Sequence, residues 1–219
     1  MVDNIQKEVP IVTITDFLVS EAIKRANEVR KNKTKLNEYT YRNKGEGIEL
    51  GCLAEIIFET QLELFSIPKT DWENNNTKAL DYTVRDLKIE VKSKDRTVPP
   101  QPEYACTVSN YNADFQKVDF YYFVSFQRDK KSAGINGIKW PHSAHLVGAS
   151  SSQFFHNHSI FLREGDRDGP NMTIKFDCHN IRIEHTIPND GFMVKCLGGS
   201  TESGKYAGNT NEGDQTSSP

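Results

Sequence analysis

Long hydrophobic runs are absent from this sequence. No apolar stretch approaches the 18 or so residues that a membrane-spanning helix needs, and no signal peptide is visible. Positive charge is not in excess either, because the formal net charge over the 219 residues is −3. This charge excludes a generally basic nucleic-acid coat protein. No internal repeat is visible, so we expect one domain with decorations and no membrane partner.

Cysteine is scarce and scattered, and no pair has the C-x-x-C spacing of a structural zinc site. A disulfide framework is equally unsupported, which favours a reducing compartment and hence a cytoplasmic location. The four cysteines are Cys52, Cys106, Cys178 and Cys196.

Basic residues are concentrated near the N-terminus, where Lys24 to Lys44 holds eight Lys or Arg and two Glu. This segment suits either a phosphate backbone or a solvated helix face. A helix is predicted over 17–33, capped by Thr15 or Asp16, followed by an aromatic and basic loop over 39–47. We divide the chain into a decoration over 1–45, a main domain over 46–197 and a tail over 198–219. The tail has too few apolar residues to offset its ordering entropy and is predicted to be disordered.

The main domain alternates between helix and strand patterns, which indicates an α/β protein. A largely buried helix is predicted over 48–65, and a short one over 153–157 after a serine cap. The run 118–126 is almost wholly apolar or aromatic, as in a central strand covered on both faces. Further strands are expected over 104–109 and 144–149, and a late β pair is expected to join 172–176 with 181–184.

A hairpin over 80–93 carries the most informative polar residues. If Arg85 and Asp86 form its turn, Asp81 lies opposite Glu90, with Cβ atoms about 5 Å apart, where like charges repel. A divalent cation between the two carboxylates is one explanation, since Mg²⁺ prefers such oxygens. Lys92 follows on the same face. The alternative is an exposed hairpin with charges alternating for solubility.

Another carboxylate, Glu55, lies next to the apolar stripe of the helix over 48–65. A carboxylate there is costly unless it is paired, metal-bound or able to reach water from an edge position. Glu49 and Glu59 are weaker candidates on the same helix.

The ordered set Glu55, Asp81 and Glu90-Val91-Lys92 resembles the PD-(D/E)XK nuclease superfamily, most clearly over 48–126. The later run from His145 is similar to uncharacterised phage-type members, whose location would be the host cytoplasm if the chain is viral. Leu80 stands where many relatives have proline. The resemblance implies a restriction-endonuclease-like fold, with a mixed central β-sheet flanked by α-helices.

This resemblance also implies a function, a Mg²⁺-dependent deoxyribonuclease in which Mn²⁺ can substitute, with no organic cofactor. Asp81, Glu90 and the Val91 carbonyl would bind the metal, with Glu55 helping directly or through water. Lys92 would orient or deprotonate the attacking water, or neutralise the phosphate. The residues expected to contact DNA are Lys94, Arg96, Asn110, Arg42 and Lys44.

The late histidines suggest a second chemistry. A zinc site from His142, His145, Cys178 and His179 is conceivable, but its spacing is loose and surface histidines are the simpler explanation. The contiguous His-Asn-His at 156–158 says little about an HNH nuclease site, because the three residues of that site are far apart in the sequence.

Two wider alternatives stay open. A non-catalytic module that binds DNA or a protein would use the same fold, although it would not need opposed carboxylates. Among enzymes, restriction-like cleavage, junction resolution and exonuclease trimming share this site, and we favour an endonuclease. The helix over 17–33 would serve either DNA contact or formation of a homodimer.

Overall fold

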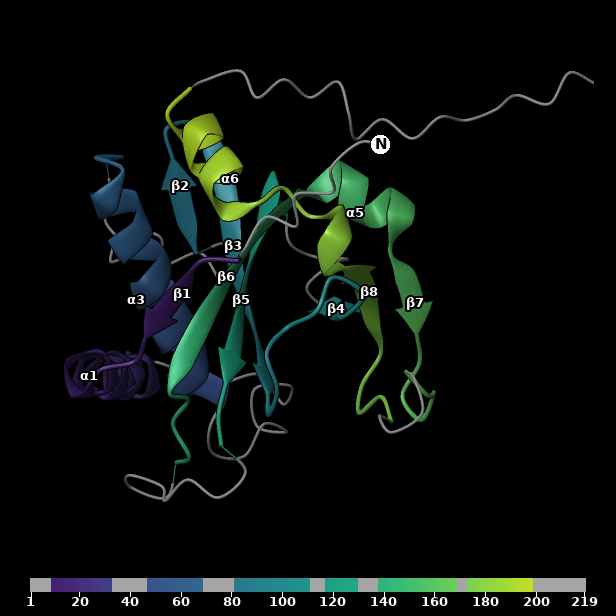
Figure 1. The fold of residues 1–219 in the computed structure, drawn as a ribbon, viewed down its shortest axis with the longest axis horizontal. Coiled ribbons are helices and arrows are strands. Elements are labelled where there is room, and N and C mark those ends of the chain that lie inside the picture. Colours follow the sequence, from purple (N-terminus) through teal and green to yellow (C-terminus); the bar gives the residue numbers. More distant parts are fainter. Residues whose placement is uncertain are drawn as a thin grey trace, which may run out of the picture.

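The computed structural model describes residues 9–32, 47–68, 81–110, 117–129, 138–168 and 173–198. Two β-sheets organise these residues (Figure 1). The main sheet has the strand order β1-β6-β5-β3-β2, and a smaller sheet has the order β4-β8-β7. The main-sheet strands are β1 (Ile11–Thr13), β2 (Tyr82–Val84), β3 (Leu87–Arg96), β5 (Phe120–Gln127) and β6 (Ser143–Ser151). The small sheet contains β4 (Ala105–Ser109), β7 (Ile160–Leu162) and β8 (Cys178–Arg182).

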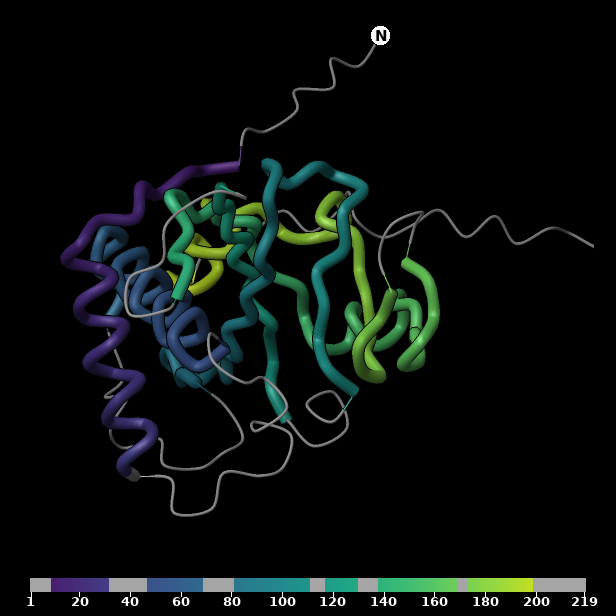
Figure 2. The backbone as a smooth tube through the Cα atoms, turned by 90° about the horizontal axis from the view of Figure 1, so that it is seen from below, coloured from purple at the N-terminus to yellow at the C-terminus, as the bar shows by residue number. Residues whose placement is uncertain are grey.

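Helices cover the main sheet on the side away from the small sheet. Helix α3 (Gly47–Leu64) packs against β3, and α1 (Asp16–Asn32) packs against α3. Figure 2 shows α1 in purple running beside α3 in blue. Thr15 caps α1 by accepting a 3.4 Å hydrogen bond from the Leu18 N–H. The predicted mixed α/β architecture, with helices flanking a mixed sheet, is therefore confirmed.

Strand β5 lies in the centre and is buried on both faces, as its composition predicted. It runs parallel to β3 and antiparallel to β6. Tyr122 and Val124 pack into the core formed with α3, whereas Tyr121 and Phe123 pack into a second core facing the small sheet. Since strand side chains alternate between faces, this one strand supplies both cores.

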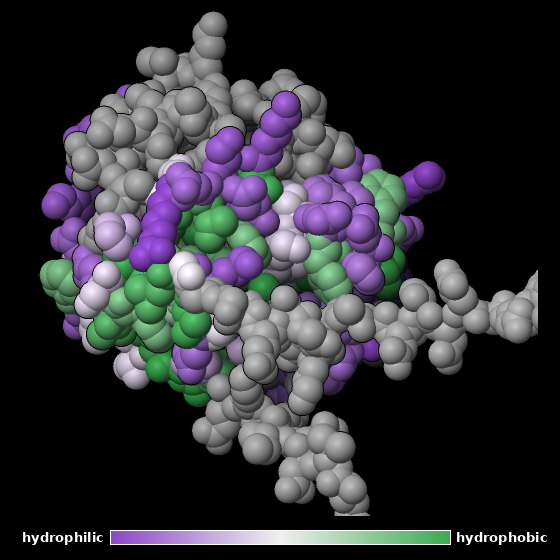
Figure 3. Space-filling view, turned by 90° about the horizontal axis from the view of Figure 1, so that it is seen from above, coloured by the Kyte–Doolittle hydropathy of each residue, from purple (hydrophilic) through white to green (hydrophobic). Residues whose placement is uncertain are grey.

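Strand β1 joins the N-terminal part of the chain to the sheet by pairing with β6 in antiparallel register. At the opposite end of the chain, α6 (Asn189–Cys196) packs against β6. Figure 3 shows the upper face of Figure 1, where hydrophobic residues gather on one side among hydrophilic ones. Val194 and Leu197, in and after α6, are 42% and 40% exposed. The sequence patterns did not predict α6.

The late β pair was predicted incorrectly. Strand β8 pairs on one side with β4 and on the other with β7, a three-residue strand that no alternation marked. Residues 183–185 form a 3₁₀ turn (η2, Ile183–His185), and Thr173 makes only an isolated bridge to Arg167. Because β4 and β7 occupy both edges of β8, the segment before it has no edge to pair with.

Short helix α5 (Ser152–His158) was predicted correctly, and its cap is Ser151, whose side chain accepts from the Phe154 N–H at 3.2 Å. The predicted disordered tail beyond Gly198 and the predicted loop up to residue 46 lie outside the described residues.

Candidate active site

The β2–β3 hairpin has the predicted register, with Tyr82 opposite Ile89 and Val84 opposite Leu87. Arg85 in its turn adopts a positive φ of 53°, which a two-residue hairpin turn requires of at least one residue. Asp81 lies just before β2 and its backbone N–H donates to the Ile89 carbonyl at 3.2 Å. Its carboxylate Oδ2 accepts from the Val91 N–H at 2.8 Å. Contacts with the residues before and after Glu90 therefore hold Asp81 beside Glu90.

The electrostatic surroundings of Asp81 are unfavourable for its charge. Burial, followed by the negative charges of Glu90 and Glu55, raises the pKa of Asp81 well above its ordinary value. Lys92 and the Val91 N–H act in the opposite direction without cancelling the effect. Asp81 is therefore close enough to Glu90, Glu55 and Lys92 for each of their charges to act on its carboxylate.

Glu90 and Lys92 extend from the same face of β3 and form an ion pair, with Nζ 2.6 Å from Oε1. Their side chains are only 7% and 15% exposed. Tyr121 pairs with Glu90 in the register of β3 and β5, and burial together with the Glu90 charge raises the pKa of Tyr121 to about 12. The pair thus lies at the margin of the second core, where a charge interacts more strongly than in water.

Glu55 lies on α3, and its carboxylate Oε2 is 3.7 Å from the Arg25 guanidinium of α1. Arg25 also forms two hydrogen bonds to Glu59, of 3.0 and 2.9 Å. Glu59 in turn accepts from the Tyr82 hydroxyl at 2.8 Å. The weaker candidate Glu49 pairs with Arg30. Sequence reasoning missed the roles of Arg25 and Tyr82, because nothing in the local pattern indicates which helix faces which carboxylate.

The carboxylates have the chemistry that Mg²⁺ or Mn²⁺ requires, since hard cations prefer oxygen ligands. Each of them contacts a positive or hydrogen-bonding group of the protein: Glu90 contacts Lys92, Glu55 contacts Arg25, and Asp81 contacts the Val91 N–H. Within the described residues no three His, Cys, Asp or Glu side chains converge with metal-ligand geometry. The carboxylates are thus the right type of ligand for the cation but do not form a metal site in their present positions, and binding would require them to turn away from their present partners.

The conceivable zinc site does not form among its described residues. His145 contacts Gln127 at 3.0 Å, and His142 lies 3.9 Å from Asp129, both beside the main sheet. His179 belongs to the small sheet, where its ring nitrogens contact Ser159 and Asn110 at 3.1 Å each. The four proposed ligands are divided between the two sheets.

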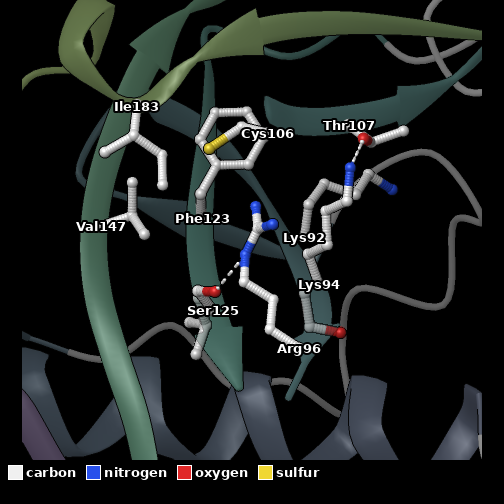
Figure 4. Close-up of a pocket in the computed structure, with 11 residues that line it drawn as sticks. Lys92, Lys94, Arg96, Cys106, Thr107, Phe123, Ser125, Val147 and Ile183 are labelled. Atoms are coloured by element: carbon white, nitrogen blue, oxygen red, sulfur yellow. Dashed lines mark hydrogen bonds between the residues drawn. The ribbon is translucent and has the colours of Figure 1, made fainter. Parts of the chain in front are cut away.

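Lys94 and Arg96 follow Lys92 along β3 and point into a hollow between the two sheets (Figure 4). Lys94 Nζ donates to the Thr107 hydroxyl at 2.7 Å. Arg96 donates to the Ser125 hydroxyl at 2.8 Å and to the Ala105 carbonyl at 2.7 Å. Burial, and for Lys94 also the neighbouring Arg96, lowers the pKa of both groups.

This hollow is small, with about 10 Å³ of space, enough for roughly one water molecule. Its apolar walls include Phe123, Val147 and Ile183. A nucleic-acid phosphate does not fit beside Lys94 and Arg96 unless the sheets move apart, so their assignment to DNA contact stays a prediction.

The other predicted DNA contacts are less informative. Asn110 directly follows the small-sheet strand β4, and there its side chain contacts His179 and its N–H donates to the Asp177 carbonyl at 2.9 Å. Arg42 and Lys44 lie outside the described residues.

No family model, curated protein or solved structure matches this chain. In the described part of the chain, no helix combines the length and the apolar character needed to cross a membrane.

Proposed function

We propose that the chain is a metal-dependent DNA nuclease that hydrolyses phosphodiester bonds as an endonuclease, on a restriction-endonuclease-like fold. The observation that carries the proposal is that Asp81 is held beside Glu90 at one end of the hairpin, with Lys92 in contact with Glu90. Glu55 is near enough for its charge to act on Asp81. Such a concentration of negative charge is costly in a protein unless a cation or a substrate interaction compensates for it. The resemblance of the same four positions to the PD-(D/E)XK superfamily supports this interpretation.

In this proposal Asp81, Glu90 and the Val91 carbonyl hold the metal, and Glu55 holds it directly or through water. When bound, Mg²⁺ or Mn²⁺ would polarise the phosphodiester and stabilise the charge that develops on it. Hydrolysis adds the oxygen of water to phosphorus and breaks one P–O bond. Lys92, once Glu90 has turned to the metal, would have its ammonium available to orient that water or to neutralise the phosphate.

A non-catalytic module that binds DNA or protein is the second candidate. It is favoured by the two ion pairs, Glu90 with Lys92 and Glu55 with Arg25, which give each of these carboxylates a positive partner without any ligand. In that case the Arg25–Glu55 pair would serve to hold α1 on α3, and the Glu90–Lys92 pair would only neutralise charge within β3.

Cleavage assays with purified protein separate these candidates. Supercoiled, linear, single-stranded and four-way-junction DNA are incubated with Mg²⁺, Mn²⁺ or EDTA. Asp81→Asn and Lys92→Met are compared with two controls from the same hairpin, Asp86→Asn and Lys88→Met, whose side chains are exposed. We expect cutting only with metal, a loss of at least about a hundredfold in the two site variants, as for removal of a general acid–base group, and normal rates in the controls.

The proposal fails if no substrate is cut under any condition and calorimetry detects no Mn²⁺ binding that depends on Asp81. Equal cutting by wild type and Lys92→Met would instead point to a contaminating nuclease.

A further inference from the structure

Lys94 and Arg96 bring two positive charges into the hollow between the two sheets (Figure 4). They are two residues apart on β3, so their side chains extend from the same face of the strand. Each is half-buried and reaches across to the small sheet, where Lys94 contacts Thr107 and Arg96 contacts the Ala105 carbonyl. The two cations therefore lie close together where solvent screens their charges less than at an open surface.

Within the described residues, every hydrogen bond from these two side chains goes to a neutral oxygen. Lys94 Nζ donates to the Thr107 hydroxyl at 2.7 Å. Arg96 donates to the Ser125 hydroxyl at 2.8 Å and to the Ala105 carbonyl at 2.7 Å. An ammonium and a guanidinium together carry more N–H donors than these three bonds use. Donors of both cations therefore remain for a further acceptor.

The neighbouring carboxylates are engaged elsewhere. Asp95 follows Lys94 on β3, but its side chain extends from the other face and accepts from Arg128 at 2.6 Å. Asp168 accepts from the Asn180 amide at 2.9 Å, and a hydroxyl separates Asn180 from Lys94. Neither carboxylate thus neutralises the two cations by direct contact.

The size of the hollow limits what else could neutralise them. It has about 10 Å³ of space, enough for roughly one water molecule, and its walls include the apolar Phe123 and Val147. A halide ion is only slightly larger than water, whereas phosphate and sulfate are several times larger. Burial, and then the charge of Arg96, lowers the pKa of Lys94, as expected for a cation without a counter-ion in contact.

We propose that this hollow binds a single chloride-sized anion between the Lys94 ammonium and the Arg96 guanidinium. The anion would accept hydrogen bonds from the remaining donors and offset the repulsion between the two cations. Because both side chains also contact the small sheet, the bound ion would strengthen the junction between that sheet and β3. The inference goes beyond the proposed function and requires neither metal binding nor DNA cleavage.

Differential scanning calorimetry of the full chain at pH 7 tests this site, with sodium chloride compared with sodium gluconate at equal ionic strength. Gluconate is too large for the hollow, and equal ionic strength keeps the screening of exposed charges constant. Chloride at about ten times its dissociation constant would shift the folding equilibrium about elevenfold, because it binds only the folded protein. For a chain of this length we expect a Tm about 3 to 6 °C higher in chloride.

Three variants connect this difference to the hollow. Lys94→Met and Arg96→Met each remove one of the two cations, and each should abolish the Tm difference between the two salts. The matched control is Lys88→Met, which removes the same charge from an exposed position on β3 and should keep the difference. Sodium sulfate should raise the Tm equally in the wild type and in Lys94→Met, because sulfate acts through its general exclusion from protein surfaces.

Three outcomes of the calorimetry would overturn the inference. These are a Tm difference between chloride and gluconate below about 1 °C in the wild type, a full difference in Lys94→Met and Arg96→Met, or its loss in the Lys88→Met control. If a methionine variant does not fold, anomalous diffraction from wild-type crystals grown in bromide decides. A bromide peak between Lys94 and Arg96 is expected, and its absence there would overturn the inference. None of these results affects the nuclease proposal, which is tested by metal-dependent cutting.

Discussion

Replacing Asp81 by Asn should stabilise the metal-free protein. Two unit charges about 5 Å apart repel each other by roughly 3 kcal/mol at an effective dielectric constant of about 20. Asp81 faces such a repulsion from Glu90 and Glu55, partly offset by Lys92. The amide oxygen of Asn can still accept from the Val91 N–H, as the carboxylate does at 2.8 Å. After the offset by Lys92 we expect a net gain of about 1 to 2 kcal/mol.

The assay is a thermal melt in EDTA at pH 7, followed by circular dichroism. For a chain of this length the gain corresponds to a rise in Tm of about 2 to 8 °C. Asp86→Asn, in the exposed hairpin turn, should change Tm by less than about 1 °C, in line with ordinary surface substitutions. In Mg²⁺ the wild type should gain stability and Asp81→Asn should not, because a ligand that binds only the folded state stabilises it. A lower Tm for Asp81→Asn in EDTA would refute the reasoning, since the carboxylate would then be favourable where it is.

Two further outcomes concern the scaffold. Gly148→Ala should cost about 3 kcal/mol or more in chemical unfolding, because its φ is +114° and a Cβ would lie 1.9 Å from the Ile187 carbonyl oxygen. Gly165→Ala, at φ +95° with open space around it, should cost about 1 to 2 kcal/mol, and equal costs would contradict the clash. Burial, followed by the charge of His142, lowers the pKa of His145. As the pH decreases below 6.5, the His145 imidazole therefore takes up a proton in the unfolded chain before it does so in the folded protein, and the free energy of unfolding should fall. As the pH is lowered, the Tm should fall less steeply for His145→Gln than for the wild type or for the control His185→Gln, whose residue is exposed. Parallel curves of Tm against pH would contradict this prediction.

Local sequence patterns predicted those parts of the fold that depend on residues close together in the chain. The register of the β2–β3 hairpin follows from a two-residue turn and a period of two, so the sequence alone places Asp81 and Glu90 side by side. The double burial of β5 follows from its composition. Helix α3 follows from its apolar periodicity, which also placed Glu55 beside the core stripe.

Other features depend on contacts between distant segments, which a local pattern does not record. The small sheet brings β4 and β8 together, and Thr107 donates to Asn180 at 2.6 Å across 73 positions of sequence. Short β7 and α6 have too few residues for a periodic signal, so packing against the sheets specifies them.

The candidate site shows the same division. The identity and order of its carboxylates and Lys92 are readable in the chain, because the hairpin and the helix each place their own residues. The partners of those carboxylates are a tertiary result. Arg25 is 30 residues from Glu55 and 34 from Glu59 in the sequence, and only the packing of α1 on α3 brings its guanidinium to both. The hollow that holds Lys94 and Arg96 likewise exists only because two separate sheets face each other. Residue types set which charges are available, and the three-dimensional packing sets which of them meet.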